Sequence, residues 1–310
     1  MTREHWGSRF GFIMATAGFS VGLGNIWRFP YQVGANGGAA FLIVYVAFAI
    51  LIGIPLMTAE ISLGRKSQLS PIAGMKKLTG HPWSPWNLIG WMGIVTLFFI
   101  ASYYMMLLAW ILGYFVMIAA GSMSVGSPAD IQSSFDTFVA RPLPVLGYDL
   151  LLVIGIGVVV ARGLRNGVER MAKLAMPVFL VMLVILMVRS LTFPGSGEGL
   201  TWYLAPDFSK LNGGVVLAAL GQAFYSIGIG MAAAFGFGSY LDPDTGDVPG
   251  SAAMVVGFDT GVAVIMGLVI FPALFAFGIA PDSGQGLLFV TMPNLFGQMP
   301  AGHAFGAAFF

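Results

Sequence analysis

The sequence predicts an all-α membrane protein, and three observations lead to this class. Of 310 residues, 57% are hydrophobic and only 9% are charged, whereas about 25% are charged in a typical soluble domain. Apolar runs long enough to cross a bilayer, about 20 residues each, recur along the chain. Two of these runs contain glycine-rich interruptions. This pattern excludes an ordinary water-soluble enzyme.

The remaining composition excludes several further classes of function. A net charge of +1 gives no indication of a nucleic-acid partner. The absence of cysteine excludes disulfides, thiolate chemistry and cysteine-ligated metals. The three histidines, His5, His81 and His303, are too scattered to indicate a metal centre. The first apolar run is longer than a signal-peptide core and lacks a small-residue cleavage pattern, so we expect no cleavable signal.

The expected spans follow from the apolar runs in chain order. Each run is long enough for a helix that crosses the hydrocarbon core. We expect seven complete spans, near residues 10–33, 38–63, 88–120, 145–161, 171–190, 212–240 and 252–279. The apolar end, from about residue 302 to Phe310, is expected to be an eighth span that is cut short.

The basic residues predict how the spans are oriented. Lys and Arg accumulate on the cytoplasmic side of membrane proteins. Ten of the 14 basic residues lie at the N-terminus or in the loops after spans two and four. They are Arg3, Arg9, Arg65, Lys66, Lys76, Lys77, Arg162, Arg165, Arg170 and Lys173. We therefore expect a multi-pass protein in a lipid bilayer with a cytoplasmic N-terminus.

Spans one and six combine glycine with polar side chains at mid-membrane depth. Span one contains GFSVGLGN from residue 18, and span six contains GQAFYSIGIG from residue 221. Glycine favours an unwound backbone, which is tolerated inside a membrane only where it lines a protein cavity. We expect unwound segments near 18–24 and 226–230. For either run alone, close helix packing through small residues is an equal alternative.

The spacing of the two interrupted spans indicates an inverted repeat. Span six begins five spans after span one, and an odd offset inverts the topology of the second repeat. We expect a first five-helix repeat over residues 1–190 and an incomplete second repeat over 191–310. Broken helices at matching positions of inverted repeats are typical of transporters that bind substrate at the midplane.

Two acidic residues lie within apolar spans, where ionisable groups are costly and indicate function. Glu60 lies in span two, and we favour a structural role in which it accepts bonds from backbone N–H groups of a broken helix. Asp259 lies in span seven, and we favour a ligand for a hard cation such as sodium. A protonated, purely structural Asp259 is the alternative.

The stretch GFSVGLGNIWRFPYQVGANGGAAF, Gly18 to Phe41, is identified as the signature first helix of the neurotransmitter:sodium symporter family. Further landmarks follow in the same order, namely Tyr103-Tyr104, residues 222–226, residues 267–271 and Met292-Pro293. The chain most resembles the bacterial amino-acid branch. The resemblance implies a LeuT-type inverted five-helix repeat, sodium-coupled symport by alternating access, and a location in a bacterial inner membrane.

The resemblance also implies two sodium sites. The first would use the Ser20 carbonyl, the Asn25 side chain, Ser226 and Asp259, and the substrate carboxylate would complete it. The second would use the carbonyls of Gly18 and Val21. Its other ligands belong to the middle of helix eight, which the sequence does not include, so we expect the second site to be incomplete.

The substrate implied by the resemblance is a large apolar or aromatic L-amino acid. Gly22 stands where monoamine-transporting relatives have an aspartate, so an amino acid rather than an amine is expected. Gly228 is expected to leave room for a large side chain and Met231 to adapt its shape, although Met231 could equally be packing filler. The binding residues would be Phe19, Ser20, Leu23, Gly24, Ile100, Tyr104, Phe224, Tyr225, Ser226, Gly228 and Met231.

Chloride independence is expected because Asp259 already supplies a negative charge. Tyr45, Gln222 and Ser226 match some chloride ligands of chloride-dependent relatives, but Ala263 offers no hydroxyl. A chloride beside an ionised Asp259 would be repelled in a low-dielectric site.

The family's gates are matched only in part. Arg28 and Gln32, with Tyr104 and Phe224, resemble an extracellular gate, and Arg3, Trp6 and Tyr240 an intracellular one. The acidic partner of each gate arginine is absent from the sequence, so a snorkelling role for Arg28 and a topological role for Arg3 are equal alternatives.

Nine residues separate Gly167 from Pro177 in span five. This spacing matches a pattern with which the bacterial branch unwinds that helix, and an ordinary proline kink is an equal alternative.

Several rival interpretations remain at this point. The apolar C-terminal end predicts a truncated chain, which could be a non-transporting fragment of the symporter. A proton-coupled amino-acid carrier could use Asp259 or Glu60 as its relay. A channel would have unbroken pore-lining helices. An enzyme is least expected, because no nucleophile constellation or metal motif accompanies the buried acids.

Overall fold

The computed structural model describes residues 4–121, 128–243, 246–278, 289, 292–297 and 302–310. All regular secondary structure in these ranges is helical, which confirms the all-α class.

The helices follow the expected spans in chain order. The first three spans are α1 (Arg9–Ser20) with η1 (Gly24–Arg28) and α2 (Phe29–Ala35); α3 (Ala39–Phe48) with η2 (Ala49–Gly53) and α4 (Ile54–Ser67); and α6 (Asn87–Ala119). The next are α8 (Pro142–Ala161), η3 (Leu164–Glu169) with α9 (Arg170–Leu191), α11 (Gly213–Ile227) with α12 (Ala233–Gly238), and α13 (Val248–Ala276). The helix α15 (Gly302–Phe309) lies at the expected eighth span.

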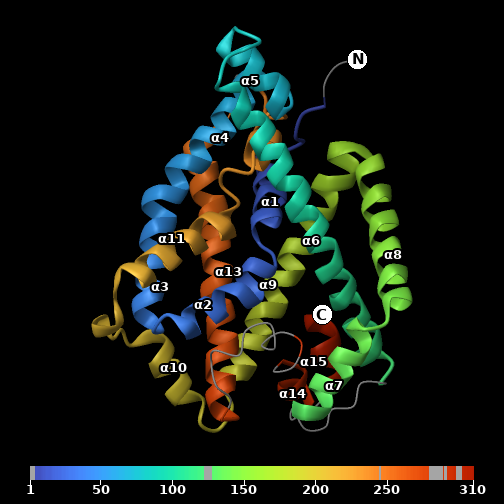
Figure 1. The fold of residues 1–310 in the computed structure, drawn as a ribbon, viewed down its shortest axis with the longest axis vertical. Coiled ribbons are helices and arrows are strands. Elements are labelled where there is room, and N and C mark those ends of the chain that lie inside the picture. The colour runs from blue at the N-terminus through green and yellow to red at the C-terminus, as the bar shows by residue number, and fades with distance from the viewer. Residues whose placement is uncertain (1–3, 122–127, 244–245, 279–288, 290–291, 298–301) are drawn as a thin grey trace.

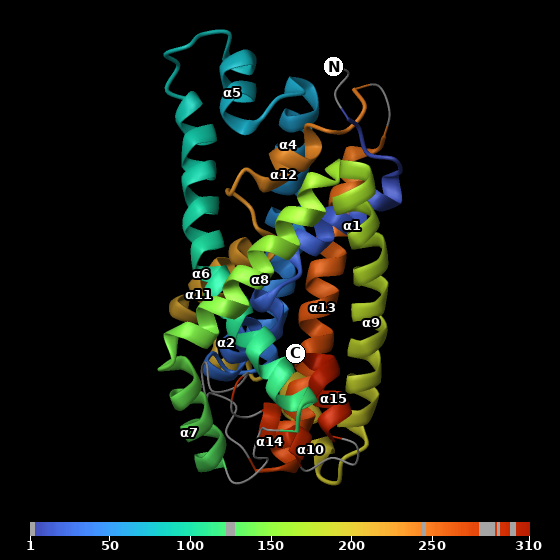
Figure 2. The same cartoon turned by 90° about the vertical axis from the view of Figure 1, so that its right-hand side faces the viewer.

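Short helices that we did not predict join the spans. They are α5 (Pro71–Thr79), α7 (Pro128–Val139), α10 (Ser196–Leu204), η4 (Phe208–Lys210) and α14 (Met292–Gly297). In Figures 1 and 2, α5 lies at the end of the molecule where the described chain starts, and α7, α10 and α14 lie at the opposite end.

Within the described ranges, five helices are long and apolar enough to cross a membrane, and six if the pair Arg9–Ser20 and Gly24–Ala35, bent by 54°, counts as one span. The prediction of seven complete spans is therefore too high by this measure. The difference lies in span six, because α11 has only 15 residues before the helix is interrupted.

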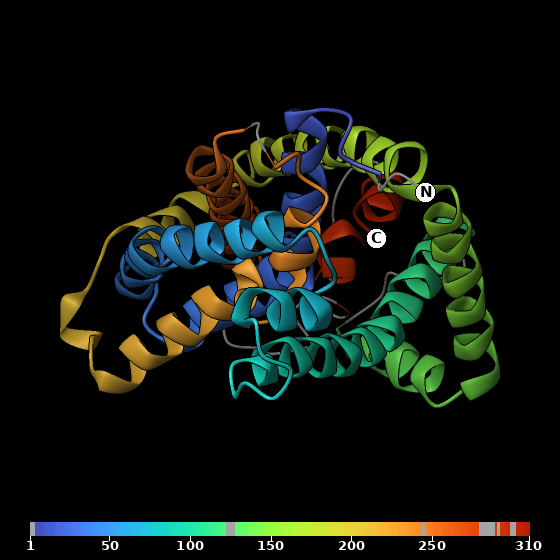
Figure 3. The ribbon, with the colours of Figure 1, turned by 90° about the horizontal axis from the view of Figure 1, so that it is seen from above.

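The helix α13 forms the centre of the bundle, and α8 lies at its edge. α13 contacts α1, α4, α9 and α10, and much of its surface is buried. Figure 3 shows α6 and α8 to one side of this bundle. No residue of α8 is buried, although the helix is strongly apolar. Such a helix suits a lipid-facing position, because lipid covers apolar surface that water would not.

Both breaks start later than predicted, the first where α1 ends at the extended residue Val21 and the second where α11 ends at Gly228. α1 continues through Gly18 to Ser20, and the break covers residues 21–23. A Cβ on Gly18 would lie 3.4 Å from Met176 Sδ, so this glycine allows close packing on α9. In span six, the helix continues to Ile227, and the break covers residues 228–232 because Gly228, at φ 77°, ends α11 in the left-handed conformation.

Candidate functional site

The two helix breaks meet in the middle of the bundle. Ser20 Oγ at the end of α1 donates to the Ile227 carbonyl at the end of α11, at 3.0 Å. Gln222 Nε2 donates to the Gly24 carbonyl at 3.2 Å. A Cβ on Gly24 would lie 3.1 Å from the Tyr225 ring, so only glycine allows this approach without a shift. Backbone groups released at both breaks therefore lie close to one another.

A fully buried polar cluster lies beside this meeting point. Asn25 Nδ2 donates to Asp259 Oδ1 at 2.8 Å, and Ser226 Oγ donates to Asp259 Oδ2 at 2.8 Å. Asn25 Nδ2 also lies 3.1 Å from Ser226 Oγ, and Tyr45 OH lies 3.5 Å from the same oxygen. A buried carboxylate is costly unless it is hydrogen-bonded or paired with a cation. The structure thus brings together three side chains that the resemblance assigned to the first sodium site.

The oxygen-rich chemistry of this cluster fits a hard monovalent cation. Asn25 Oδ1 accepts from the Gly22 N–H at 3.0 Å, so in this arrangement its amide oxygen faces the backbone break and its NH2 group faces Asp259. Among the described residues, no group of three or more acidic or histidine side chains could hold a metal ion. A cation here would therefore depend on one carboxylate and neutral oxygens, after a turn of the Asn25 amide.

Glu60 accepts a hydrogen bond from the backbone of the second break. Its Oε1 accepts from the Gly230 N–H at 2.6 Å, and Gly230 has a φ of 82° in the broken segment of span six. A backbone N–H released from a helix needs such a partner inside a membrane. This geometry matches the structural role that we favoured for Glu60.

Aromatic and charged side chains lie on the α2 side of the breaks. Tyr104 OH lies 3.2 Å from Tyr225 OH, and a Cβ on Gly22 would be 3.9 Å from Tyr104 OH. The Arg28 guanidinium lies 4.3 Å from the centre of the Tyr225 ring and donates to Gln222 Oε1. Arg28 is thus held over the breaks by partners on α11.

Gln32, which the gate prediction groups with Arg28, has a different partner from Arg28 in this structure. Gln32 Oε1 instead accepts from Asn36 Nδ2 at 3.0 Å. Sequence reasoning missed the contact of Arg28 with Gln222. The spacing of Gln222 and Tyr225, three residues apart on one helix face, is the signal that could have found it.

The space that we expected beside Gly228 for a large substrate side chain is occupied by the Phe19 ring. That part of the pocket prediction is therefore wrong for this structure. A Cβ on Gly228 would lie 2.6 Å from Phe19 Cε1. The glycine is needed for its left-handed backbone and for the approach of the Phe19 ring. Ile100, Phe224 and Met231 are half-buried, whereas Leu23 is buried.

The N-terminal segment closes the other side of the site. Trp6 Nε1 donates to the Phe237 carbonyl at 2.9 Å, and Trp6 N donates to the Tyr240 carbonyl at 3.2 Å. The rings of Phe19 and Phe237 have centroids 5.9 Å apart, as do those of Trp6 and Phe237. Trp6 and Tyr240 therefore lie in contact, whereas Arg3 lies outside the described residues, and an intracellular gate at this place stays a prediction.

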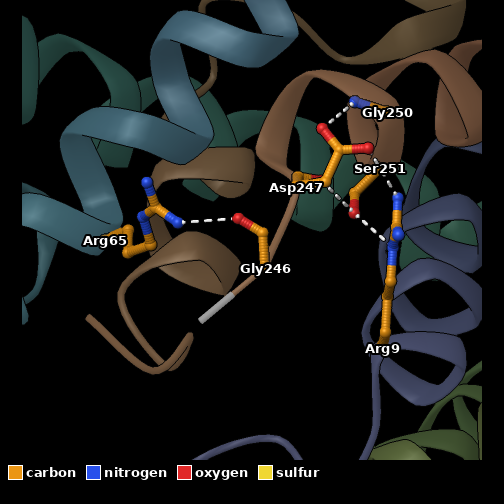
Figure 4. A network of polar contacts seen from close by, with 6 residues as sticks. All are labelled: Arg9, Arg65, Gly246, Asp247, Gly250 and Ser251. Atoms are coloured by element: carbon orange, nitrogen blue, oxygen red, sulfur yellow. Dashed lines mark hydrogen bonds and ion pairs between the residues drawn. The ribbon is translucent and has the colours of Figure 1, made fainter. Parts of the chain in front are cut away.

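A polar network that we did not predict anchors the same end (Figure 4). Arg9 donates to Asp247 Oδ2 at 3.1 Å and to Ser251 Oγ at 3.2 Å. Asp247 caps α13 by accepting from the Gly250 N–H at 2.9 Å, and Arg65 donates to the Gly246 carbonyl at 3.1 Å. The network joins the starts of α1 and α13 across 238 residues of sequence, which no local pattern could indicate.

Loss of the Arg9 to Asp247 ion pair is expected to loosen the N-terminal closure. Because the chain has no cysteine, a spin label on His5→Cys would report the mobility of this segment uniquely. Asp247→Asn should raise the mobile fraction by about threefold, a modest effect because an exposed ion pair contributes little. Electron paramagnetic resonance measures the mobile fraction. Asp207→Asn, an exposed acid next to η4, is the control, and an equal rise there would contradict the assignment.

The same network predicts a pH dependence of the closure. The Gly250 N–H and then Arg9 hold the pKa of the Asp247 carboxyl below its usual range. A lowered folded-state pKa means that the contribution is present above the ordinary pKa of about 4 and is lost as the pH falls through the folded value. The spin label should stay ordered down to about pH 4 and become mobile below it. A loss of order already near neutral pH would contradict this account.

Span five is a π-helix from Leu164 to Glu169 and an α-helix from Arg170 to Leu191, so in this structure no unwound segment separates Gly167 from Pro177. Gly167 lies in η3, where a Cβ would come within 1.9 Å of the Val159 carbonyl oxygen. Pro177 lies inside α9. The glycine here permits close packing of η3 on α8.

Two broken helices that meet beside a buried Asn, Ser and Asp cluster, within a bundle of apolar helices, define a secondary transporter. The sequence profile of the sodium:neurotransmitter symporter family matches residues 3–126 and 141–310. The chain belongs to this family of sodium-dependent symporters.

Individual relatives agree with this family. An uncharacterised sodium-dependent transporter, YhdH, of Bacillus subtilis is 40% identical over 98% of this chain and 67% of its own length. A sodium- and chloride-dependent creatine transporter of Oryctolagus cuniculus is 29% identical over 99% of this chain and 56% of its own length. The crystal structure of MhsT in complex with L-phenylalanine superposes with a TM-score of 0.90 at 43% identity, over 99% of this chain and 69% of that chain. The chain thus spans roughly two thirds of its bacterial relative and of MhsT.

Proposed function

We propose that the protein carries hydrophobic and aromatic L-amino acids together with sodium by alternating access, without a need for chloride. The buried cluster of Asn25, Ser226 and Asp259 at the meeting point of the two breaks is the observation that carries this proposal. A carboxylate that accepts two hydrogen bonds in a dry site is suited to a cation that arrives with substrate.

The first sodium site would use Asp259, Ser226, the Asn25 amide oxygen and the Ser20 carbonyl. These groups lie at the ends of two helices and on α13, so a cation would tie the three elements together. The negative charge of Asp259 would leave no need for chloride near Tyr45 and Ser226. The Gly18 and Val21 carbonyls would contribute to a second sodium site.

The substrate carboxylate would lie near the Tyr104 hydroxyl and the amides of Leu23 and Gly24. Gly22 supports an amino acid, because it supplies no acid to replace that carboxylate, and it lies beside Tyr104, whose hydroxyl would be 3.9 Å from a Cβ at this position. The ammonium would face carbonyls released at the breaks, including that of Phe19. MhsT, which is 43% identical, has been solved with L-phenylalanine, and this supports an aromatic substrate.

The protein would lie in a bacterial inner membrane as two inverted five-helix repeats, 1–190 and an incomplete 191–310, with a cytoplasmic N-terminus. The charge distribution supports this orientation. Arg65, Lys66, Lys76 and Lys77 lie on or beside α4 and α5, at the end where the described chain starts (Figure 1).

Competition binding tests the substrate class. Unlabelled tryptophan, phenylalanine and leucine should displace radiolabelled phenylalanine from the purified protein in sodium at least about tenfold more effectively than glycine, which corresponds to about 1.4 kcal/mol of side-chain contact. Replacing chloride by gluconate should leave binding unchanged. Equal displacement by glycine would contradict the apolar pocket, and a loss of binding in gluconate would contradict chloride independence.

A proton-coupled carrier is the second candidate, favoured by the complete burial of Asp259. Uptake into vesicles under a pH gradient, in the absence of sodium, would support it. Uptake that requires sodium at constant pH would support the symporter.

A further inference from the structure

A basic depression lies at the start of α9, away from the helix breaks. It has a volume of about 330 Å³ and is lined by Gly7, Arg165, Glu169, Arg170 and Lys173. Three cations and one carboxylate surround it, so its formal charge is positive. Neither the proposed sodium sites nor the proposed substrate pocket uses these side chains.

The single carboxylate of the depression is already engaged. Glu169 Oε2 accepts from the Gly7 N–H at 2.7 Å, and Oε1 accepts from Ser8 Oγ at 3.1 Å. Oε1 also lies 2.5 Å from Lys173 Nζ. The side chain of Glu169 is only 3% exposed. Glu169 therefore neutralises Lys173, and no acidic side chain among the described residues forms an ion pair with Arg165 or Arg170.

Both arginines retain guanidinium donors that bond to no acceptor among the described residues. Arg165 uses its Nε to donate to the His5 carbonyl at 2.7 Å. Within the described part of the chain, no other hydrogen bond or ion pair engages Arg165, and none engages Arg170. Both side chains are exposed. Two guanidinium groups with unused donors beside one depression form a binding site for an anion such as phosphate.

An apolar stripe continues from the depression along α9. Its members recur every three or four residues and are each at least 50% exposed, so they share one helix face. They are Met171, Leu174, Val178, Val181, Ile185 and Val188. Arg170 precedes Leu174 by one helical turn and lies on the same face. Along the helix, basic side chains are thus followed by an apolar stripe. A phospholipid has the same order, with its phosphate followed by its acyl chains.

We propose that this face of α9 binds an anionic phospholipid, with its phosphodiester at Arg165 and Arg170 and an acyl chain along the stripe. The depression lies at the end of a predicted span, at the depth of lipid headgroups. Its excess positive charge favours an anionic lipid over a zwitterionic one, whose headgroup carries a compensating cation. The stripe favours a lipid over a soluble anion, because a free phosphate would leave the apolar surface uncovered.

Native mass spectrometry of the purified 310-residue protein, with phosphatidylglycerol or phosphatidylcholine of the same acyl chains added, tests this site. The wild type should retain one phosphatidylglycerol more tightly than phosphatidylcholine. Arg170→Gln should weaken phosphatidylglycerol by about fivefold, the factor expected for the loss of one basic side chain near a lipid surface. Arg165→Gln combined with Arg170→Gln should abolish the preference between the two lipids.

Matched variants distinguish lipid binding at Arg165 and Arg170 from the loss of any basic residue and from a loss of folding. Arg189→Gln changes a basic residue at the opposite end of the same helix and should leave the preference intact. Arg170→Lys keeps the charge and should retain most of the binding, which distinguishes the loss of a charge from a loss of folding. An equal effect of Arg189→Gln, or unchanged binding in the double variant, would overturn the proposal. Complete displacement of phosphatidylglycerol by millimolar inorganic phosphate would also overturn it, because the site would then take a soluble anion.

Discussion

Asp259→Ala is expected to abolish sodium-dependent binding of amino acids. Asp259 contributes the only carboxylate to the buried cluster with Asn25 and Ser226, and both of its oxygens accept hydrogen bonds there. Alanine would remove the charge that attracts the cation and leave buried donors without acceptors, which costs about 1–3 kcal/mol for each group. Binding of radiolabelled phenylalanine in sodium should fall to the level seen in potassium.

Two control variants keep this prediction falsifiable. Asp259→Asn retains Oδ1 as an acceptor for Asn25 and nearly the same volume, so it should fold while binding much less sodium. Asp207→Ala removes an exposed acid at 3.8 Å from Lys210 and should leave binding unchanged. Near-normal sodium-dependent binding in Asp259→Ala would exclude Asp259 from the cation ligands.

Gly228→Leu is expected to abolish the binding of small and large amino acids alike. Gly228 has a φ of 77°, and a residue with a Cβ costs about 1–2 kcal/mol in this left-handed conformation. The Cβ would also lie 2.6 Å from Phe19 Cε1, so the ring would have to move from the break. Both effects disturb the backbone that forms the site. Competition binding with alanine and tryptophan measures the result.

Gly221→Leu is the matched control for this variant, because Gly221 lies on the same helix and an added Cβ there meets no atom within 4 Å. It should bind as the wild type does. A Gly228→Leu protein that binds alanine and excludes only tryptophan would contradict the packing seen here. That result would support the pocket that the sequence alone suggested.

The sequence predicted the parts of this structure that depend on local pattern. Apolar runs gave the helices, and glycine with polar residues located both breaks to within a few positions. The start of α13 was predicted near 252, four residues late, although Asp247 before Val248-Pro249 is a pattern typical of a capped helix. For Glu60 the sequence favoured a structural role, because an acid at that depth needs a partner, and its Oε1 accepts from the Gly230 N–H.

The remaining features depend on contacts between distant segments. Nothing near Gly228 in the sequence indicates that Phe19, more than 200 residues earlier, fills the space beside it. The partners of Arg9 and Arg28 lie on α13 and α11, so they become visible only when the helices are packed. Gly18 and Gly167 show the same ambiguity, because a glycine that permits close packing and a glycine that permits unwinding look alike in sequence.

Equilibrium binding of radiolabelled phenylalanine to the purified protein, in sodium and in potassium at the same ionic strength, tests the central proposal most directly. The proposal predicts saturable binding in sodium that potassium does not support, and a tighter apparent affinity as sodium rises, because cation and substrate would stabilise each other. The same measurement on a version extended to the length of the relatives should give the same ion dependence. Saturable binding that is equal in sodium and potassium would contradict sodium coupling at the Asn25, Ser226 and Asp259 cluster.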